Sequence, residues 1–333
     1  MMKEAGEAPA IVASQLARNA QLSAELGELL RTRPPRAVAT IARGSSDNAA
    51  TYARYLLETK LGVLTASSAP SVSSVYGVRP DMTDVLVLAL SQSGRSPDLL
   101  AASHAALDAG AMLAAIVNDE SSPLAELAPA VIPIGAGAEL SVAATKSFIA
   151  TLAAVAQLAA QWSGDEELGN ALLELPDALA AAWTLDWSVA VEALAAADNL
   201  FVVGRGLNLG IAQEAALKFK ETCGIHAEAF SAAEVRHGPI TLVGRNFPVL
   251  VFLPEDDARA GVEESVRLLR SLGGEVLTVG GSGEGALPLV NCHPLLLPIV
   301  AAQAFYRMLD AVAQCRGRNP DAPPHLGKVT ETL

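Results

Sequence analysis

The sequence predicts two α/β domains in tandem, each with a doubly wound parallel sheet between two layers of helices. Short apolar runs alternate with long helical patterns, as in sheets buried on both faces. This alternation occurs twice, and 333 residues are enough for two domains. Hydrophobic residues make up 51% and aromatic residues only 4%, so we expect cores of Ala, Leu and Val.

The first half contains four predicted strands. Apolar residues 37–42 and 85–90 each lead through a small polar turn into a helical pattern. Polar residues 45–48 cluster where the first of these helices begins. Residues 112–118 and 131–134 are predicted as the third and fourth buried strands.

The second half repeats this order. Residues 199–221 mirror the first strand, turn and helix, with Arg205 lying 162 residues after Arg43. Residues 248–256 mirror the second strand at an offset of 163, and residues 275–281 mirror the third at a similar offset. Matching landmarks at nearly one offset indicate a duplicated domain.

This repeat sets the expected boundaries. We predict an N-terminal amphipathic helix over 1–30, a first domain over 31–165, a helical connector over 166–190, a second domain over 191–318 and a C-terminal tail over 319–333.

Bulk properties argue against several classes of partner. The net charge is −13 without a basic cluster, which disfavours nucleic acid. Apolar stretches are interrupted before the ~18–20 residues that a membrane span needs, and no targeting sequence is recognisable. The three cysteines lack metal or CxxC spacing and are predicted to be buried free thiols, so the expected location is the cytoplasm.

Ligands of open parallel sheets bind at the carboxyl ends of the strands, so the polar turns there are candidate sites. The turn Ser91–Ser96, with Gln92 and Ser93, offers backbone N–H groups, hydroxyls and a helix N-terminus to a phosphate monoester. The alternative is a simple helix cap. The turn at 254–257 is acidic and would repel phosphate, so we expect only one half to keep a phosphate site.

Gly44, Ser45 and Ser46 follow the first strand and could bind sugar hydroxyls or phosphate, or only cap a helix. Residues 139–148 place further polar side chains at a helix start, which alone is a weak signal.

Three further features carry ionisable groups. Glu214, Lys218 and Glu221 share one helix face, which is either a solvated stripe or a site. His237 precedes Gly-Pro in a turn and is a candidate acid/base group, although a lone histidine is more often structural. Lys328 stands in a Pro-rich tail that would by default be frayed; a tail held in place could present it as an amine nucleophile.

Taken together, the motifs GSS, SQSGRS, ELSVAATKSF, EAALKFKE, IHAEAF, EVRHGP and DAPPHLGK, in that order, resemble the sugar isomerase (SIS) domain family. More closely, the chain resembles the isomerase half of isomerising glutamine–fructose-6-phosphate aminotransferases, from about residue 40 to the end. The resemblance implies two flavodoxin-like SIS domains and no metal or other cofactor.

The resemblance also implies roles for individual residues. The catalytic ones are Glu221, which moves a proton between C1 and C2, His237, which opens the sugar ring from a second subunit of a homodimer, and Lys328, which can form a Schiff base. The substrate-binding ones are Gly44, Ser45, Ser46, Ser91, Gln92, Ser93, Ser96, Val142 and Lys218. A carboxylate and a histidine suit these proton transfers.

The chain departs from the aminotransferases in two respects. No glutaminase half precedes the isomerase motifs, so we expect no glutaminase activity. Pro324 and His325 replace an Arg and an Asn in the tail, which is similar to SIS-type glucosamine-6-phosphate deaminases and leaves open whether Lys328 bonds to the substrate or only steadies it. The expected reaction is isomerisation with release of ammonia to give fructose 6-phosphate.

Two alternatives stay open. One is another phosphosugar isomerase or deglycase of the same family, which ammonia release would distinguish. The other is a non-catalytic phosphosugar-binding regulator, which would not need Glu221, His237 and Lys328 together.

Overall fold

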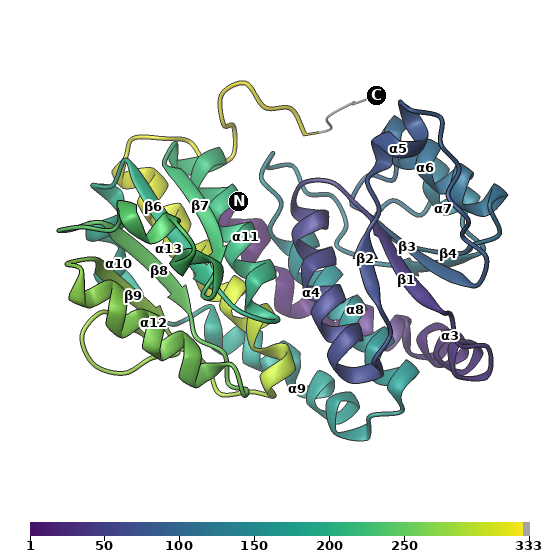
Figure 1. Cartoon of the computed structure of the whole chain (residues 1–333), viewed down its shortest axis with the longest axis horizontal. Coiled ribbons are helices and arrows are strands. Elements are labelled where there is room, and N and C mark those ends of the chain that lie inside the picture. The colour runs from purple at the N-terminus through teal and green to yellow at the C-terminus, as the bar shows by residue number, and fades with distance from the viewer. Residues whose placement is uncertain (329–333) are drawn as a thin grey trace. The chain divides into compact units, whose positions relative to one another are not determined.

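The computed structural model describes residues 1–328 and contains two five-stranded sheets, both entirely parallel (Figure 1). The first sheet has the order β2-β1-β3-β4-β5, formed by Thr65–Ser67, Ala37–Ile41, Val85–Ser91, Met112–Val117 and Ala130–Pro133. The second has the order β10-β9-β8-β6-β7, formed by Ala286–Leu287, Glu275–Val279, Pro248–Phe252, Asn199–Gly204 and His226–Ser231.

Both sheets have one topology. Numbered within its own half, the second sheet also has the order 2-1-3-4-5, which is the doubly wound order with a switch point between its first and third strands. The predicted fold class and its duplication are therefore confirmed.

Helices precede, connect and cover the strands. Those in the first half are α1 (Met2–Gly6), α2 (Ala8–Arg18), α3 (Ala20–Thr32), α4 (Ser45–Leu61), α5 (Pro70–Ser74), α6 (Pro97–Asp108), α7 (Pro123–Leu127) and α8 (Lys146–Ser163). Those in the second half are α9 (Glu166–Ala182), α10 (Ser188–Ala195), α11 (Asn208–Lys218), α12 (Arg259–Ser271) and α13 (Leu297–Cys315), with a π-helical turn at Phe219–Cys223 and 3₁₀ turns at Glu234–Arg236, Pro239–Leu242 and Pro294–Leu296.

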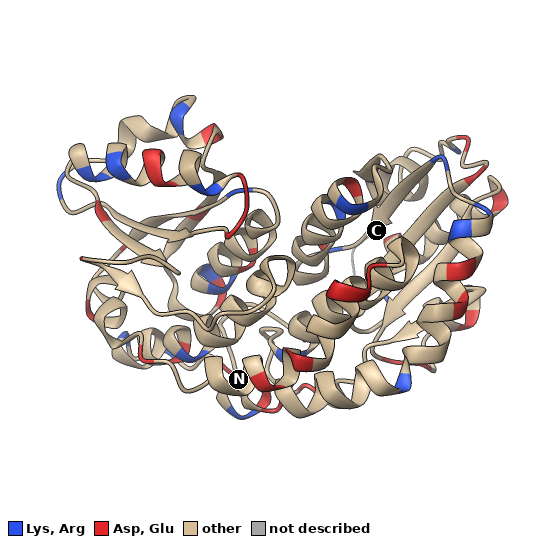
Figure 2. Cartoon of the chain, turned by 90° about the horizontal axis from the view of Figure 1, so that it is seen from below, with Lys and Arg blue, Asp and Glu red and all other residues tan. Residues whose placement is uncertain are grey.

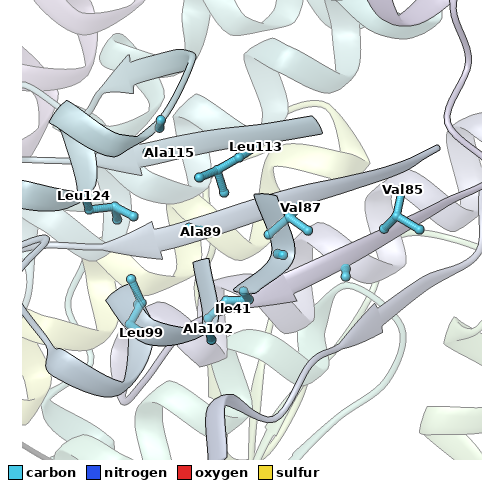
Figure 3. Close-up of a cluster of buried hydrophobic side chains, with 12 residues drawn as sticks. Ile41, Val85, Val87, Ala89, Leu99, Ala102, Leu113, Ala115 and Leu124 are labelled. Atoms are coloured by element: carbon cyan, nitrogen blue, oxygen red, sulfur yellow. The ribbon is translucent and has the colours of Figure 1, made fainter. Parts of the chain in front are cut away.

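Charged residues lie mainly on helices and loops, and the strands carry few of them (Figure 2). All seven residues of β3 are buried, because helices cover both faces of a central parallel strand. One side of the first sheet packs Ile41 and Val87 against Leu99 of α6 and Leu124 of α7 (Figure 3). Phe201, Val251 and Val262 belong to the corresponding cluster of the second sheet.

Contacts divide the chain into two compact units. The first unit holds the first sheet and comprises Ala10–Glu139, Lys146–Leu173 and the described end of the chain from Gly327. The second unit holds the second sheet and comprises Met1–Pro9, Leu140–Thr145 and Glu174–Leu326. The sequence repeat did not indicate that residues 1–9 and 140–145 pack with the second half.

Some local features differ from the expectations. The N-terminal 30 residues form three helices in place of one. Strands β2, β7 and β10 were not predicted. Of the cysteines, Cys223 is buried, Cys292 is partly buried and Cys315 is exposed, so the expectation of buried thiols is correct only for Cys223. The segment Pro294–Cys315 is long and apolar enough to span a membrane, but 83% of its most apolar window is buried inside the protein, as in a core helix.

Candidate functional site

The first unit presents two polar turns at one edge of its sheet. Strands β1 and β3 are adjacent and parallel, with Ile41 opposite Ala89. Their carboxyl ends therefore lie side by side at the switch point of the sheet, where open α/β sheets bind ligands. The turns that follow these strands, 42–44 and 92–96, are the ones that the sequence singled out.

The turn Ser91–Ser96 is held by its own serines. Ser91 ends β3, and its Oγ accepts a hydrogen bond from the Gly94 N–H at 3.0 Å. The Ser93 Oγ accepts one from the Arg95 N–H at 3.4 Å. Ser96 is the N-cap residue of α6, but its side chain makes no capping hydrogen bond. The capping alternative therefore does not account for Ser96.

Gly94 has a conformation and an environment that exclude a larger residue. Its φ is +62°, and a Cβ atom at this position would overlap the Oγ and Cβ atoms of Ser122. Ser122 in turn caps α7 by accepting a hydrogen bond from the Ala125 N–H at 3.3 Å. The shape of the turn thus depends on close packing against the neighbouring connection.

Two arginines beside this edge are occupied by carboxylates. Arg43 binds the buried Asp98 of α6 through Nε at 2.8 Å and a terminal nitrogen at 2.6 Å. Arg95 binds Asp119 at 2.8 Å. The turn consequently offers an anion mainly neutral donors, namely hydroxyls, amides and the N-terminus of α6.

Gly44 is the N-cap residue of α4, with φ +55° and open space where a side chain would begin. Ser45 and Ser46 form the first turn of the same helix and are partly exposed. The N–H groups of Ser46, Asp47 and Asn48 already donate to the carbonyls of Arg43 and Gly44, so this turn mainly offers a ligand close approach at the glycine.

In the second unit, Glu214, Lys218 and Glu221 form one cluster. The Nζ atom of Lys218 lies 2.5 Å from Glu221 Oε2 and 3.5 Å from Glu214 Oε1. Glu214 is fully buried and accepts a hydrogen bond from the Tyr306 hydroxyl of α13 at 3.0 Å. The alternative of a solvated charged stripe is therefore wrong for Lys218 and Glu214.

The cluster has one member that reaches solvent. Lys218 is 1% exposed and Glu221 is 20% exposed, at the π-helical turn that follows α11. Burial alone would lower the pKa of Lys218, but the carboxylates of Glu214 and Glu221 raise it, and the net direction is upward. The Lys218 ammonium group thus holds the Glu221 carboxylate at the edge of the core.

His237 lies in the tight connection between two 3₁₀ turns, as expected for a turn histidine, and is exposed. Its N–H donates to the Glu234 carbonyl at 2.9 Å. The next residue, Gly238, has φ +135°, which only glycine adopts readily. The backbone is therefore specified at this point, while the histidine remains exposed.

Lys328, the last described residue, is held by an ion pair, and residues 329–333 of the predicted tail lie outside the described part of the chain. The Nζ atom of Lys328 lies 3.3 Å from the Oε2 atom of Glu139, whose side chain is completely buried. The same carboxylate accepts hydrogen bonds from Ser147, from its hydroxyl at 2.6 Å and from its N–H at 3.3 Å. This ion pair lies within the first unit.

Val142 lies in a loop of the second unit whose backbone is held by hydrogen bonds. Its N–H donates to the Asp321 carbonyl at 3.3 Å. The buried Glu4 carboxylate accepts hydrogen bonds from the N–H groups of Leu140 and Ser141. A ligand contact by the Val142 backbone would therefore fall to its carbonyl.

Sequence reasoning missed the partners that hold these groups. Tyr306 and Glu4 lie 92 and 137 residues from their partners Glu214 and Ser141, and neither stands in a motif. Glu139 opens the ELSVAATKSF motif, but nothing in the pattern showed that it would bind Lys328.

A comparison with protein families decides where the chain belongs. The model of the SIS domain matches residues 33–161 and again residues 193–311. The chain belongs to the SIS domain family. The two matched segments contain the two parallel sheets, so each sheet is the core of one SIS domain.

Individual relatives agree with this. A glutamine–fructose-6-phosphate aminotransferase (isomerizing) of Thermus thermophilus is 33% identical over 98% of this SIS chain, which spans 58% of that enzyme. A candidate phosphosugar isomerase from Silicibacter pomeroyi DSS-3 is 43% identical, with TM-score 0.90, over 96% of this chain and 99% of its own. The glucosamine-6-phosphate deaminase of Thermotoga maritima shares the fold at 24% identity and TM-score 0.73, over 97% of this chain and 100% of its own.

Proposed function

We propose that this SIS protein is a cytoplasmic glucosamine-6-phosphate deaminase that isomerises its substrate and releases ammonia. The observation that carries the proposal is the buried Lys218 beside the partly exposed Glu221, an arrangement that holds one carboxylate ready for proton transfer. Similarity to aminotransferases that act on fructose 6-phosphate supports the choice of a phosphosugar.

The proposed chemistry uses only proton transfers and water. The ring of glucosamine 6-phosphate opens to the free aldehyde with His237 as the acid/base group. Glu221 removes the C2 proton and returns it to C1, while one proton moves from the amine nitrogen to O1, so that the amino aldehyde becomes a C2 imine with a hydroxyl group on C1. Water adds to the imine, ammonia leaves, and fructose 6-phosphate remains.

The remaining residues bind or orient the substrate. Ser91, Gln92, Ser93 and Ser96 bind the phosphate, Gly44, Ser45, Ser46 and Val142 contact the sugar, and Lys218 holds Glu221. Lys328 either forms a Schiff base at C2 or steadies the substrate as a charge. Borohydride treatment with fructose 6-phosphate distinguishes these, because only a Schiff base leaves a reduced adduct on Lys328.

An ammonia-release assay tests the function. Purified full-length protein is incubated with the 6-phosphates of glucosamine, galactosamine and N-acetylglucosamine, and ammonia and the ketose product are both measured. We expect equimolar ammonia and fructose 6-phosphate from glucosamine 6-phosphate. Ketose formation without ammonia from phosphosugars that lack an amine would support the alternative of another SIS isomerase, and binding without turnover would support a regulator.

A binding variant tests the phosphate assignment. Ser93→Ala removes one hydroxyl from the turn. It should weaken the binding of all phosphorylated ligands alike, by about 1.5–3 kcal/mol, the contribution of a hydrogen bond to a charged group. Ser73→Ala, on another surface segment of the first unit, is the matched control. A Ser93 variant that binds phosphorylated ligands as tightly as the wild type contradicts the assignment.

A further inference from the structure

The second SIS domain has a sheet edge that corresponds to the one bearing the turn Ser91–Ser96 in the first domain. Strands β6 and β8 are adjacent and parallel, with Val203 opposite Val251, at the switch point of the second sheet. Arg205 follows β6 as Arg43 follows β1. The helix after β8 is α12, which corresponds to α6.

The buried faces of α6 and α12 align the two helices. In α6 the buried positions after Asp98 are Leu99, Ala102, Ser103 and Ala106, and in α12 they are Val262, Ser265, Val266 and Leu269, each 163 residues further on. Asp98 therefore corresponds to Gly261. At this helix position, α12 therefore has no counterpart of the carboxylate that neutralises Arg43 in the first domain.

A cavity of about 540 Å³ lies at this position. Its lining includes Arg205, Arg236, His237, Gly261, Glu264 and Ser265, all within the second unit. A Cβ atom built on Gly261 meets nothing within 4 Å, so the space is open where the carboxylate of Asp98 would begin. The cavity is large enough for more than a single carboxylate group.

The charges around the cavity favour an anion. Among residues 1–328, the Arg205 guanidinium has no hydrogen bond or ion pair. Arg236 makes a loose ion pair with Glu264 at 3.5 Å, between two side chains that are 44% and 59% exposed. Two arginines against one carboxylate leave a positive balance in the lining.

The acidic turn after β8 lies outside the lining of the cavity, although the Asp256 Oδ2 atom lies 3.9 Å from the Cβ position of Gly206, the residue after Arg205. Glu255, Asp256 and Asp257 are not among the residues that line the cavity. Glu255 is paired with Arg259, which also binds Glu263 at 2.9 Å. The expectation that this turn would keep phosphate away therefore applies to the turn itself and not to the neighbouring cavity.

We propose that this cavity is a second anion site, which binds a small phosphate monoester through Arg205 and Arg236. The phosphate takes the place that the Asp98 carboxylate occupies beside Arg43 in the first domain. A guanidinium suits this role because its planar donors bind phosphate in bidentate fashion. The inference rests on the duplication: Arg205 and Arg236 hold this phosphate, and His237, which the proposed function assigns to the site of a second subunit, is not needed for its binding.

Titration calorimetry of the full chain with fructose 6-phosphate, and separately with inorganic phosphate, tests the proposal. We expect two equivalents bound per chain. Ser93→Ala should weaken one of them, and Gly261→Asp should remove the other, because the new carboxylate restores the pair with Arg205. Aspartate is compatible with the first turn of a helix, so this variant should fold. Arg205→Gln should weaken the same equivalent at least tenfold, and Arg267→Gln, on the exposed side of α12, should weaken neither.

The outcomes separate this inference from the proposed function. If only one ligand binds per chain, and only Ser93→Ala weakens its binding, the proposal of a second site is wrong. A second equivalent that survives both Gly261→Asp and Arg205→Gln would overturn it as well. A change of oligomer mass on Gly261→Asp without any change in phosphate binding would assign the cavity to an acidic side chain of a second copy, and would also overturn it. Loss of an equivalent on Gly261→Asp but not on Ser93→Ala would keep the second site and contradict the proposed phosphate turn.

Discussion

Lys218 Nζ lies 2.5 Å from Glu221 Oε2 while the lysine itself is almost entirely buried. A buried cation is stable only when it is paired, and here Glu214 supplies a second carboxylate that Tyr306 hydrogen-bonds. The lysine therefore serves the structure of the second unit and the position of the candidate catalytic carboxylate at once.

Lys218→Met is predicted to destabilise the protein by about 3–5 kcal/mol, because it leaves Glu214 buried without its cation. Urea unfolding measures this change. Lys220→Met is the matched control: Lys220 is two residues away and exposed, so its replacement should stay within about 0.5 kcal/mol. Equal losses in the two variants would show that the buried pairs contribute nothing specific.

The loop that carries Val142 is predicted to loosen in acid. Burial alone would raise the pKa of Glu4, but hydrogen bonds from Ser141 and Leu140 bring it below the ordinary value of 4.5. A carboxyl group with a lowered pKa stabilises the fold above its unfolded pKa and loses this contribution as the pH falls through the folded value.

Hydrogen exchange at the Leu140 and Ser141 amides tests this. Protection, corrected for intrinsic exchange rates, should fall as the pH drops below about 4.5. In Glu4→Gln the protection of these amides should be lower at neutral pH and independent of pH in this range. A pH-dependent loss that persists in the variant would assign the effect to another group.

Gly94→Ala and Gly44→Ala separate strain from steric overlap. Both residues have positive φ, so each substitution should cost about 1–3 kcal/mol in strain. At Gly94 the new methyl group also meets Ser122, whereas at Gly44 it meets nothing within 4 Å. Thermal or urea unfolding should therefore rank Gly94→Ala as the more destabilised variant, and the reverse order would contradict the described turn.

Mixed dimers test whether His237 acts in the site of a second subunit. Glu221→Gln and His237→Ala should each be inactive alone. If the histidine comes from the partner, refolding the two together gives one intact site in half of the dimers, about a quarter of the wild-type activity by random pairing. A mixture that stays inactive while dimers exchange would place His237 in the same chain as the Glu221 that it serves.

The long buried strands and the duplication were predictable because continuous apolar runs and a constant offset are local signals. Strands β2, β7 and β10 were not, because they are short or partly exposed and lack an apolar run. Their pairing is determined by the neighbouring strands.

The site shows the same division. The polar turns after β1 and β3 follow from strand ends, which the sequence marks. The burial of Lys218 does not, because the helical spacing of Glu214, Lys218 and Glu221 fits an exposed face equally well. Tyr306, 92 residues beyond Glu214, belongs to the packing of α13, which no local pattern reveals.

The most direct test of the account is solvent-proton exchange at C1 of fructose 6-phosphate, followed by ¹H NMR in D₂O. The wild-type protein should replace a C1 proton of fructose 6-phosphate with deuterium, because the carboxylate of Glu221 exchanges its proton with solvent between transfers. Glu221→Gln should slow this exchange at least ~100-fold, the usual scale of general base catalysis, while fructose 6-phosphate binding stays within a few-fold. Glu228→Gln, which changes an exposed residue of β7, should exchange at the wild-type rate. Wild-type exchange in Glu221→Gln would contradict the assignment of proton transfer to this carboxylate.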